Sequence, residues 1–182
     1  MHKISVWIMA LAALIVVLAG CQSKAASTET PSQMISIQTY ESLDELLAAF
    51  AAAEAPVTRA MIDDEKVYYL PENNVFGVSL QEVQAAESYF NCVYDNGMML
   101  ITKRYENGPH ALEHMVANNQ EIFAKKQEGD MEYYYADEDG IAYYFWVQDN
   151  TYLQLNIPEE ASIKLTEVAS NIKCMDLCPP II

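Results

Sequence analysis

Between residues 120 and 158 the chain is a series of short apolar runs, and turn residues separate the runs at regular intervals. Asp, Asn and Gly dominate these breaks. Such even spacing is typical of the strands of an antiparallel meander. The predicted strands of this region are 121–127, 131–136, 141–148 and 151–157.

Nearer the start of the chain, Ser42 and Glu45 stand in a capping-box pattern, three residues apart and just before apolar residues at helical spacing. The Ser side chain can accept from the amide three residues on, and the Glu can reach back. We therefore expect a helix that begins here and ends near Pro56. The pattern also predicts strands at 67–70, 75–80, 88–94 and 98–105, a short helix at 109–119, and a last helix at 158–172.

The pair Asn96-Gly97 separates two of these strands. It predicts a hairpin, because both residues tolerate a positive φ. In the first of the two strands Phe90, Cys92 and Tyr94 share one face, which we expect to be the core face. Taken together, the elements predict an α+β fold. It consists of one antiparallel, aromatic-rich sheet (a meander) covered by an N-terminal and a C-terminal helix.

The N-terminus has the pattern of an export signal. Lys3 precedes an apolar run at 6–19, which is 14 residues long, whereas a helix needs about 20 to cross a bilayer. The run ends in Leu18-Ala19-Gly20-Cys21, which resembles the lipobox of bacterial lipoproteins. The resemblance implies a signal peptide at 1–20 and a Cys21 that carries acyl chains such as palmitate and becomes the new N-terminus.

The rest of the chain then divides into a flexible tether and one domain. The segment 21–33 contains the lipidated Cys and is rich in Ser, Thr and Ala, as flexible linkers are. We expect a single extracytoplasmic domain at 34–178 and a short tail at 179–182. The expected location is the cell membrane, where the lipid anchor holds the domain on the extracytoplasmic face of the cell envelope.

The charge of the chain narrows the choice of partners. With 26 acidic and 10 basic residues, the formal net charge is −16. Nucleic acid is excluded as a partner, because its phosphates are bound by a surplus of Lys and Arg. Anionic lipid head groups would repel the same surface, so attachment to the membrane must come from the acyl anchor.

The meander and the last helix carry a second resemblance. Aromatic strands at 133–135, 143–146 and 152–155 precede a helix at 166–169. This order resembles the C-terminal module of an uncharacterised domain family in exported proteins of Gram-positive bacteria, some of them linked to anti-sigma regulators. The resemblance covers roughly residues 120 to 173. It implies the fold and an extracytoplasmic location, and it supplies no catalytic residues.

No complete catalytic set and no cofactor motif occurs in the sequence, so we expect a non-enzymatic binding, sensing or interaction module without a cofactor. Its ligand would be an unknown protein, peptide or glycan at the cell surface. The aromatic strands offer a surface for such a partner if one of their faces is exposed. The alternative for these aromatics is cross-strand pairing that only stabilises the sheet.

A zinc-dependent peptidase is the alternative function. The stretch at 110–114 reads H-x-x-E-H and resembles the inverted zinc motif of insulinase-type peptidases. On a helix, His110 and His114 would share one face, and Glu113 could activate a zinc-bound water. A third protein ligand is also required, and no residue of the sequence stands out for that role. The competing interpretation is a surface helix with a chance match, so we assign no metal ligand and no catalytic residue.

Three cysteines follow Cys21, namely Cys92, Cys174 and Cys178. In an oxidising compartment one disulfide among them is expected. A bridge from Cys92 to either of the other two closes a loop of about 80 residues and constrains the unfolded chain most. We favour that bridge, because Cys92 lies on the face that the last helix should cover. A bridge between Cys174 and Cys178, or three buried thiols, are the alternatives.

Overall fold

The computed structural model describes residues 36–52, 65–104, 107–118, 122–158 and 164–177. The chain divides into two compact units, Met1–Met34 and Ile35–Ile182, and the first lies outside the described residues. The elements of the second unit are β1 (Gln38–Tyr40), α2 (Leu43–Ala51), β2 (Lys66–Tyr69), β3 (Leu80–Ala85), β4 (Tyr89–Tyr94), β5 (Met99–Lys103), α3 (Gly108–Asn118), β6 (Ala124–Glu128), β7 (Met131–Glu138), β8 (Ile141–Gln148), β9 (Thr151–Pro158), α4 (Leu165–Asn171) and β10 (Lys173–Asp176).

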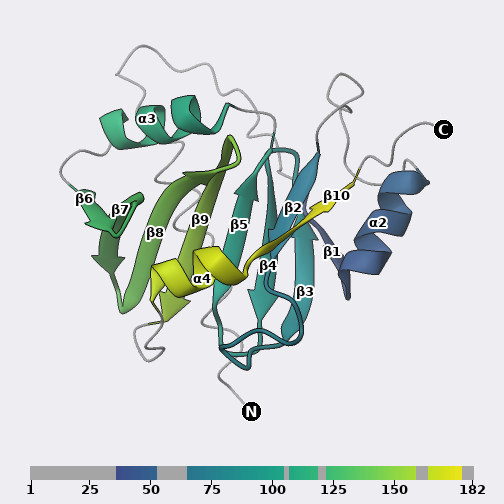
Figure 1. Ribbon diagram of the computed structural model, residues 1–182. Coiled ribbons are helices and arrows are strands. Elements are labelled where there is room, and N and C mark those ends of the chain that lie inside the picture. The colour runs from purple at the N-terminus through teal and green to yellow at the C-terminus, as the bar shows by residue number, and fades with distance from the viewer. Residues whose placement is uncertain (1–35, 53–64, 105–106, 119–121, 159–163, 178–182) are drawn as a thin grey trace, which may run out of the picture. The chain divides into compact units, whose positions relative to one another are not determined.

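Within the described residues, eight strands form one antiparallel sheet in the order β1-β3-β4-β5-β9-β8-β7-β6. The predicted meander is its β6–β9 half, and β5 joins the two halves by pairing with β9. A separate two-stranded sheet consists of β2 and β10. With three helices added, the described part of the chain has the α+β fold that the sequence predicts (Figure 1).

Helices pack on both faces of the large sheet. In β9, Leu153 and Leu155 point to one side while Tyr152 and Gln154 point to the other, because alternate residues of a strand face opposite ways. The first side packs against α4, with Leu165 in the same buried cluster, and β10 also lies in front of it (Figure 1). The second side packs against α3. We call them the α4 face and the α3 face.

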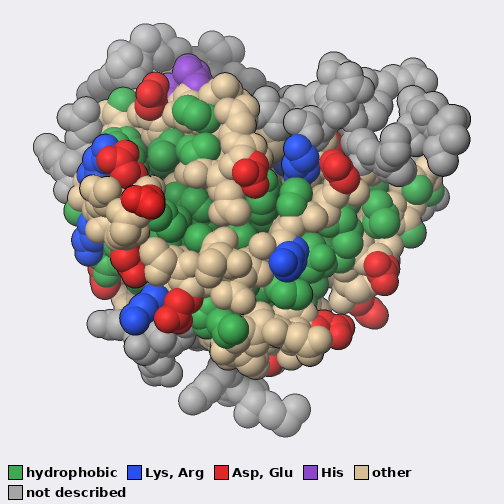
Figure 2. Space-filling model, in the orientation of Figure 1, with side chains coloured by type: hydrophobic (Ala, Val, Ile, Leu, Met, Phe, Trp, Pro, Cys, Tyr) green, Lys and Arg blue, Asp and Glu red, His purple; other side chains and the backbone are tan. Residues whose placement is uncertain are grey.

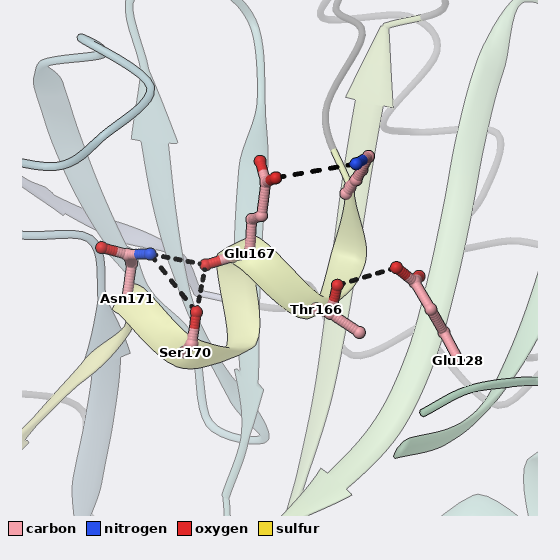
Figure 3. A network of polar contacts seen from close by, with 6 residues as sticks. Glu128, Thr166, Glu167, Ser170 and Asn171 are labelled. Atoms are coloured by element: carbon pink, nitrogen blue, oxygen red, sulfur yellow. Dashed lines mark hydrogen bonds and ion pairs between the residues drawn. The ribbon is translucent and has the colours of Figure 1, made fainter. Parts of the chain in front are cut away.

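The main core lies on the α4 face. Phe90, Cys92 and Tyr94 are almost fully buried in it, so the predicted core face of this strand is confirmed. On its outer side α4 carries a network of polar contacts (Figure 3). Thr166 donates from Oγ1 to a carboxylate oxygen of Glu128 at 2.8 Å, which ties the start of α4 to the end of β6.

Two local predictions, the capped helix and the hairpin, are confirmed, with small differences in detail. Ser42 caps α2, and its Oγ accepts from the Glu45 amide at 3.2 Å. The Glu45 carboxylate reaches back to the amide of Glu41, at 2.6 Å, one residue before the expected donor. The turn between β4 and β5 has a positive φ, 81°, at Gly97. Asn96 is not among the positive-φ residues, so glycine alone supplies the special conformation.

The predicted strand at 75–80 is wrong. This stretch is a loop organised by the buried side chain of Asn74. The side-chain Nδ2 of Asn74 donates to the carbonyls of Pro71 and Val78, both at 2.7 Å. Its Oδ1 accepts from the backbone amide of Phe76 at 3.1 Å. Because one side chain satisfies these backbone groups, the loop needs no neighbouring strand.

The helices differ from the prediction in their place. β9 continues to Pro158, and α4 begins only at Leu165. The expected pair of covering helices is seen in part: α4 lies on one face, α3 lies on the other, and α2 lies beside β1 (Figure 1). The strands β1, β3 and β10 were not expected from the pattern, and two of them pair with partners distant in sequence.

Candidate functional site

Four amide side chains lie on the α3 face of the central strands, and we call them the amide row. Gln84 in β3 stands opposite Asn91 in β4, and both Asn91 and Gln154 stand opposite Ile101 in β5. Asn156 follows two residues after Gln154 on the same face. Three of the four are buried, with exposed fractions of 1% for Asn91, 7% for Gln154 and 2% for Asn156.

The hydrogen bonds fix which way the first amides point. The carboxylate of Glu82 only accepts, so the Nε2 of Gln84 donates to it, at 2.6 Å. The Oε1 of Gln84 must then accept, and it does so from the Nδ2 of Asn91 at 3.0 Å. The Oδ1 of Asn91 is consequently an acceptor that faces away from this chain of bonds.

That oxygen has no hydrogen-bond partner. Among the described residues, the Oδ1 of Asn91 is the one buried side-chain polar atom left unpaired. A buried polar atom without a partner costs about 1–3 kcal/mol, and each case in a native protein requires an explanation. The amide row therefore contains an acceptor directed at a donor that the described residues do not supply.

A second amide pair lies across β5 from the first. The Nε2 of Gln154 donates to the Oδ1 of Asn156 at 2.8 Å. This bond leaves the Oε1 of Gln154 and the Nδ2 of Asn156 outside the pair, one an acceptor and the other a donor. The row thus offers both kinds of hydrogen-bonding group.

Between the two pairs lies an apolar strip made of Met99 and Ile101, both half-buried. The Nδ2 of Asn91 contacts the Met99 sulfur at 3.8 Å. Adjacent strands are about 4.8 Å apart, so β4 and β9, on either side of β5, are separated by about 10 Å. The apolar side chains of β5 therefore lie between the amides of β4 and those of β9.

The helix α3 closes the α3 face beside this strip. Ala111 and Met115 pack on Phe145 and Tyr152 in a second buried cluster. Gly108 brings the start of α3 against the turn between β8 and β9, so closely that a Cβ there would lie 2.6 Å from the carbonyl oxygen of residue 150. The position of the helix beside the amide row is thus fixed by contact.

The sequence carries a signal for this row, although the predictions above do not include it. In β9 the amides at 154 and 156 alternate with apolar residues at 153, 155 and 157. A strand with one apolar and one amide face, in the middle of a covered sheet, marks a place where polar groups are buried together. The neighbouring strands that complete the row are set by pairing at long range.

The two histidines of α3 are exposed, and so is Glu113. The rings of His110 and His114 are stacked, with 6.4 Å between their centroids. The Nδ1 of His114 lies 3.3 Å from the Nδ2 of Asn118. No group of three His, Cys, Asp or Glu side chains that could hold a metal occurs in the described ranges. The third ligand that a zinc peptidase requires is thus absent from the part of the chain that is described.

Cys92 and Cys174, one of the two pairs predicted for the long disulfide, are both free thiols. The Sγ of Cys92 is buried and lies 3.5 Å from the carbonyl oxygen of Tyr68 in β2, whereas Cys174 is exposed in β10 as the cross-strand neighbour of Tyr68. Tyr68 of β2 therefore lies between Cys92 and Cys174. Burial raises the pKa of the Cys92 thiol to about 12. Cys178 lies outside the described residues.

The aromatic strands form cross-strand pairs. On the α4 face the ring centroids of Tyr133 and Tyr144 are 5.9 Å apart, and those of Tyr135 and Tyr144 are 5.2 Å apart. The Nζ of Lys126 lies 3.8 Å from the Tyr135 ring centroid. Figure 2 shows hydrophobic side chains across this side of the molecule, with charged side chains around them. These contacts stabilise the sheet, which is the structural alternative that the sequence left open.

Cys21, the signal peptide predicted at 1–20 and the tether predicted up to 33 lie outside the described residues. Within the described ranges no helix is long and apolar enough to cross a membrane. No family model, no curated protein and no solved structure matches the chain. The resemblance of residues 120 to 173 to a module of exported proteins therefore stays a prediction.

Proposed function

We propose that the chain is a bacterial lipoprotein whose domain is held at the extracytoplasmic face of the cell membrane by acyl chains on Cys21. The lipobox Leu18-Ala19-Gly20-Cys21 and the short apolar run before it support this proposal. Two or three acyl chains make the attachment stable. The resemblance of residues 120 to 173 to modules of exported proteins supports the same location.

We further propose that the domain is a non-enzymatic binding module and that the amide row is its binding site. The unpaired, buried Oδ1 of Asn91 is the observation that carries this proposal. A binding site tolerates such an atom because the ligand supplies the missing donor, whereas a purely structural amide is normally paired within the protein. The exposed histidines of α3 give no comparable reason to favour catalysis.

The anchor is tested by partitioning the full chain between a detergent-rich and an aqueous phase. Wild-type protein should enter the detergent phase, and the Cys21→Ala chain should move to the aqueous phase because it cannot be acylated. Equal partitioning of the two proteins would rule out the lipid anchor.

The binding role is tested in the Cys21→Ala background, so that the anchor does not contribute. This chain should sediment with isolated cell envelopes. Adding Asn91→Leu should abolish sedimentation, because Leu has the size of Asn but no polar atoms. Gln127→Leu, a change at an exposed amide in β6, is the matched control and should sediment normally. A chain that stays in the supernatant, or that sediments equally with Asn91→Leu, would refute the binding site.

A further inference from the structure

We infer that Asn96 is a deamidation site, at which the side-chain amide is converted to a carboxylate without an enzyme. The inference is independent of the binding role proposed above. It starts from the two Asn-Gly pairs of the chain, Asn96-Gly97 and Asn107-Gly108, each preceded by an acidic residue. The local chemistry of the two pairs is alike, whereas the fold gives them opposite surroundings.

An Asn-Gly pair carries both partners of the reaction. The backbone nitrogen of Gly97 attacks the side-chain carbonyl carbon of Asn96, and the new C–N bond closes a succinimide ring. The side-chain amide leaves as ammonia and takes the proton that the Gly97 nitrogen gives up. One water then opens the ring to aspartate or isoaspartate, so water is the only co-reactant. Glycine hinders the attack least, because it has no Cβ beside the nitrogen.

The turn between β4 and β5 presents Asn96 for this reaction. The residue is exposed, and its Oδ1 accepts from the backbone amide of Met98 at 3.0 Å. This bond turns the side chain toward the backbone that follows it, where the nitrogen of Gly97 lies. It also places a donor on the oxygen that becomes negative during the attack.

The attacking nitrogen of Gly97 is held lightly. It donates to the carbonyl of Tyr94 at 2.9 Å. Among the described residues other than its chain neighbours, the one atom within 4 Å of a Cβ built at Gly97 is the Cγ of Pro158, at 3.3 Å. Opening one bond at an exposed hairpin end costs little, because such turns open locally while the core stays folded.

The second pair is locked at the start of α3. The Oδ1 of Asn107 accepts from the amide of His110 at 3.2 Å, and its carbonyl accepts from the amide of Ala111 at 2.9 Å, as in a helix cap. Gly108 is buried and donates to the carbonyl of Asn150 at 2.9 Å. A Cβ at Gly108 would lie 2.6–2.8 Å from backbone atoms. Its nitrogen is therefore freed only when the start of α3 leaves the turn between β8 and β9.

The test is mass spectrometry of tryptic peptides after the full chain, in detergent, has been kept for several days in a mildly alkaline buffer. Cleavage after Lys103 and Arg104 puts the two pairs in different peptides. In the native chain Asn96 should gain the mass of a carboxyl in place of an amide at least about tenfold faster than Asn107, because the second pair needs a much larger opening. In urea both should convert at similar rates.

Two variants separate the chemistry from the fold. Asn96→Gln should show no conversion at residue 96, because the larger ring that a glutamine would form closes far more slowly. Met115→Ala removes a buried side chain through which α3 packs on the sheet. It should speed conversion at Asn107 and leave the rate at Asn96 unchanged.

Three results would overturn the inference. The first is an equal rate of conversion at Asn96 and Asn107 in the native chain. The second is an Asn96 that converts only in urea, which would mean that the hairpin protects it. The third is a difference between the two residues that persists in urea, since local sequence and not the fold would then be its cause.

Discussion

At the scale of single residues, the most buried charges of the described chain are Glu65 and Arg104. Two nitrogens of the guanidinium contact the two carboxylate oxygens, at 3.0 and 2.8 Å. The same guanidinium lies over the rings of Phe90 and Phe50, at 4.5 and 5.6 Å from their centroids. Burial raises the pKa of Glu65 above its ordinary value, and Arg104 opposes that rise.

Arg104→Met should destabilise the domain by about 3–5 kcal/mol, because it leaves a buried carboxylate without its partner. The double variant Glu65→Leu with Arg104→Met should lose much less of the free energy of unfolding, since neither charge of the pair then remains buried. Urea denaturation measures both free energies of unfolding. If the free energy of unfolding of Arg104→Met lay within about 1 kcal/mol of the wild-type value, this account of the pair would be contradicted.

The two described thiols should react very differently. In a Cys21→Ser, Cys178→Ser background, Cys174 should react with a thiol reagent in the native protein at pH 8, because it is exposed. Cys92 should react only after unfolding, since it is fully buried and its pKa is raised to about 12, which leaves almost no thiolate below pH 9. The structure would be contradicted if both thiols of the native protein reacted at the same rate, or if neither of them reacted before unfolding.

At the scale of elements, patterns confined to neighbouring residues were predictive. The meander strands, the capped helix at Ser42 and the hairpin around Gly97 all follow local rules. The strand β3 was missed for a physical reason. A register irregularity between Leu80 and Glu82 breaks its alternation, so the pattern reads as a loop. The strand β10 exists through its pairing with β2, which no local rule reveals.

Gly108→Ala should be more damaging than a change at an ordinary turn glycine. The added Cβ would lie 2.6–2.8 Å from backbone atoms of Asn150 and of the first two residues of β9, and backbone cannot move aside as a side chain can. We expect a loss of about 1–3 kcal/mol, the usual range for overpacking, together with displacement of α3 from Phe145 and Tyr152. Thermal denaturation of the two chains measures the loss.

Gly129→Ala is the matched control. Gly129 has a φ of 62° in the turn before β7, and nothing lies within 4 Å of its added Cβ. Gly129→Ala should lower the free energy of unfolding only by the backbone strain at this φ, about 1–2 kcal/mol. A Gly108→Ala chain as stable as the wild type would mean that α3 is not held against the turn.

At the scale of the whole molecule, the proposed anchor is read from a local motif, whereas the proposed binding site is not. The lipobox is four consecutive residues, whereas the amide row joins β3, β4 and β9. Asn91 and Gln154 come to lie on the two sides of Ile101 only because β5 pairs with both β4 and β9. Local patterns identify strands with polar alternation, but the order of strands decides which polar residues meet.

The histidines of α3 illustrate the opposite case. The motif at 110–114 is local and easily recognised, yet the fold exposes both imidazoles. A chemical site needs ligands from several elements aimed at one point, and a short motif specifies only one of those elements. The amide row lacks a recognisable motif, but three strands contribute to it.

The central claim, that the amide row is a binding site, is tested most directly by the resonance of the Met99 methyl group. In the Cys21→Ala chain with ¹³C-methyl methionine, soluble envelope extract should shift the Met99 signal, since Met99 lies between the amide pairs. The signal of Met175, in β10, should stay in place. The Met99 shift should vanish in Asn91→Leu. An unmoved Met99 signal, or an equal shift in Asn91→Leu, would contradict the account.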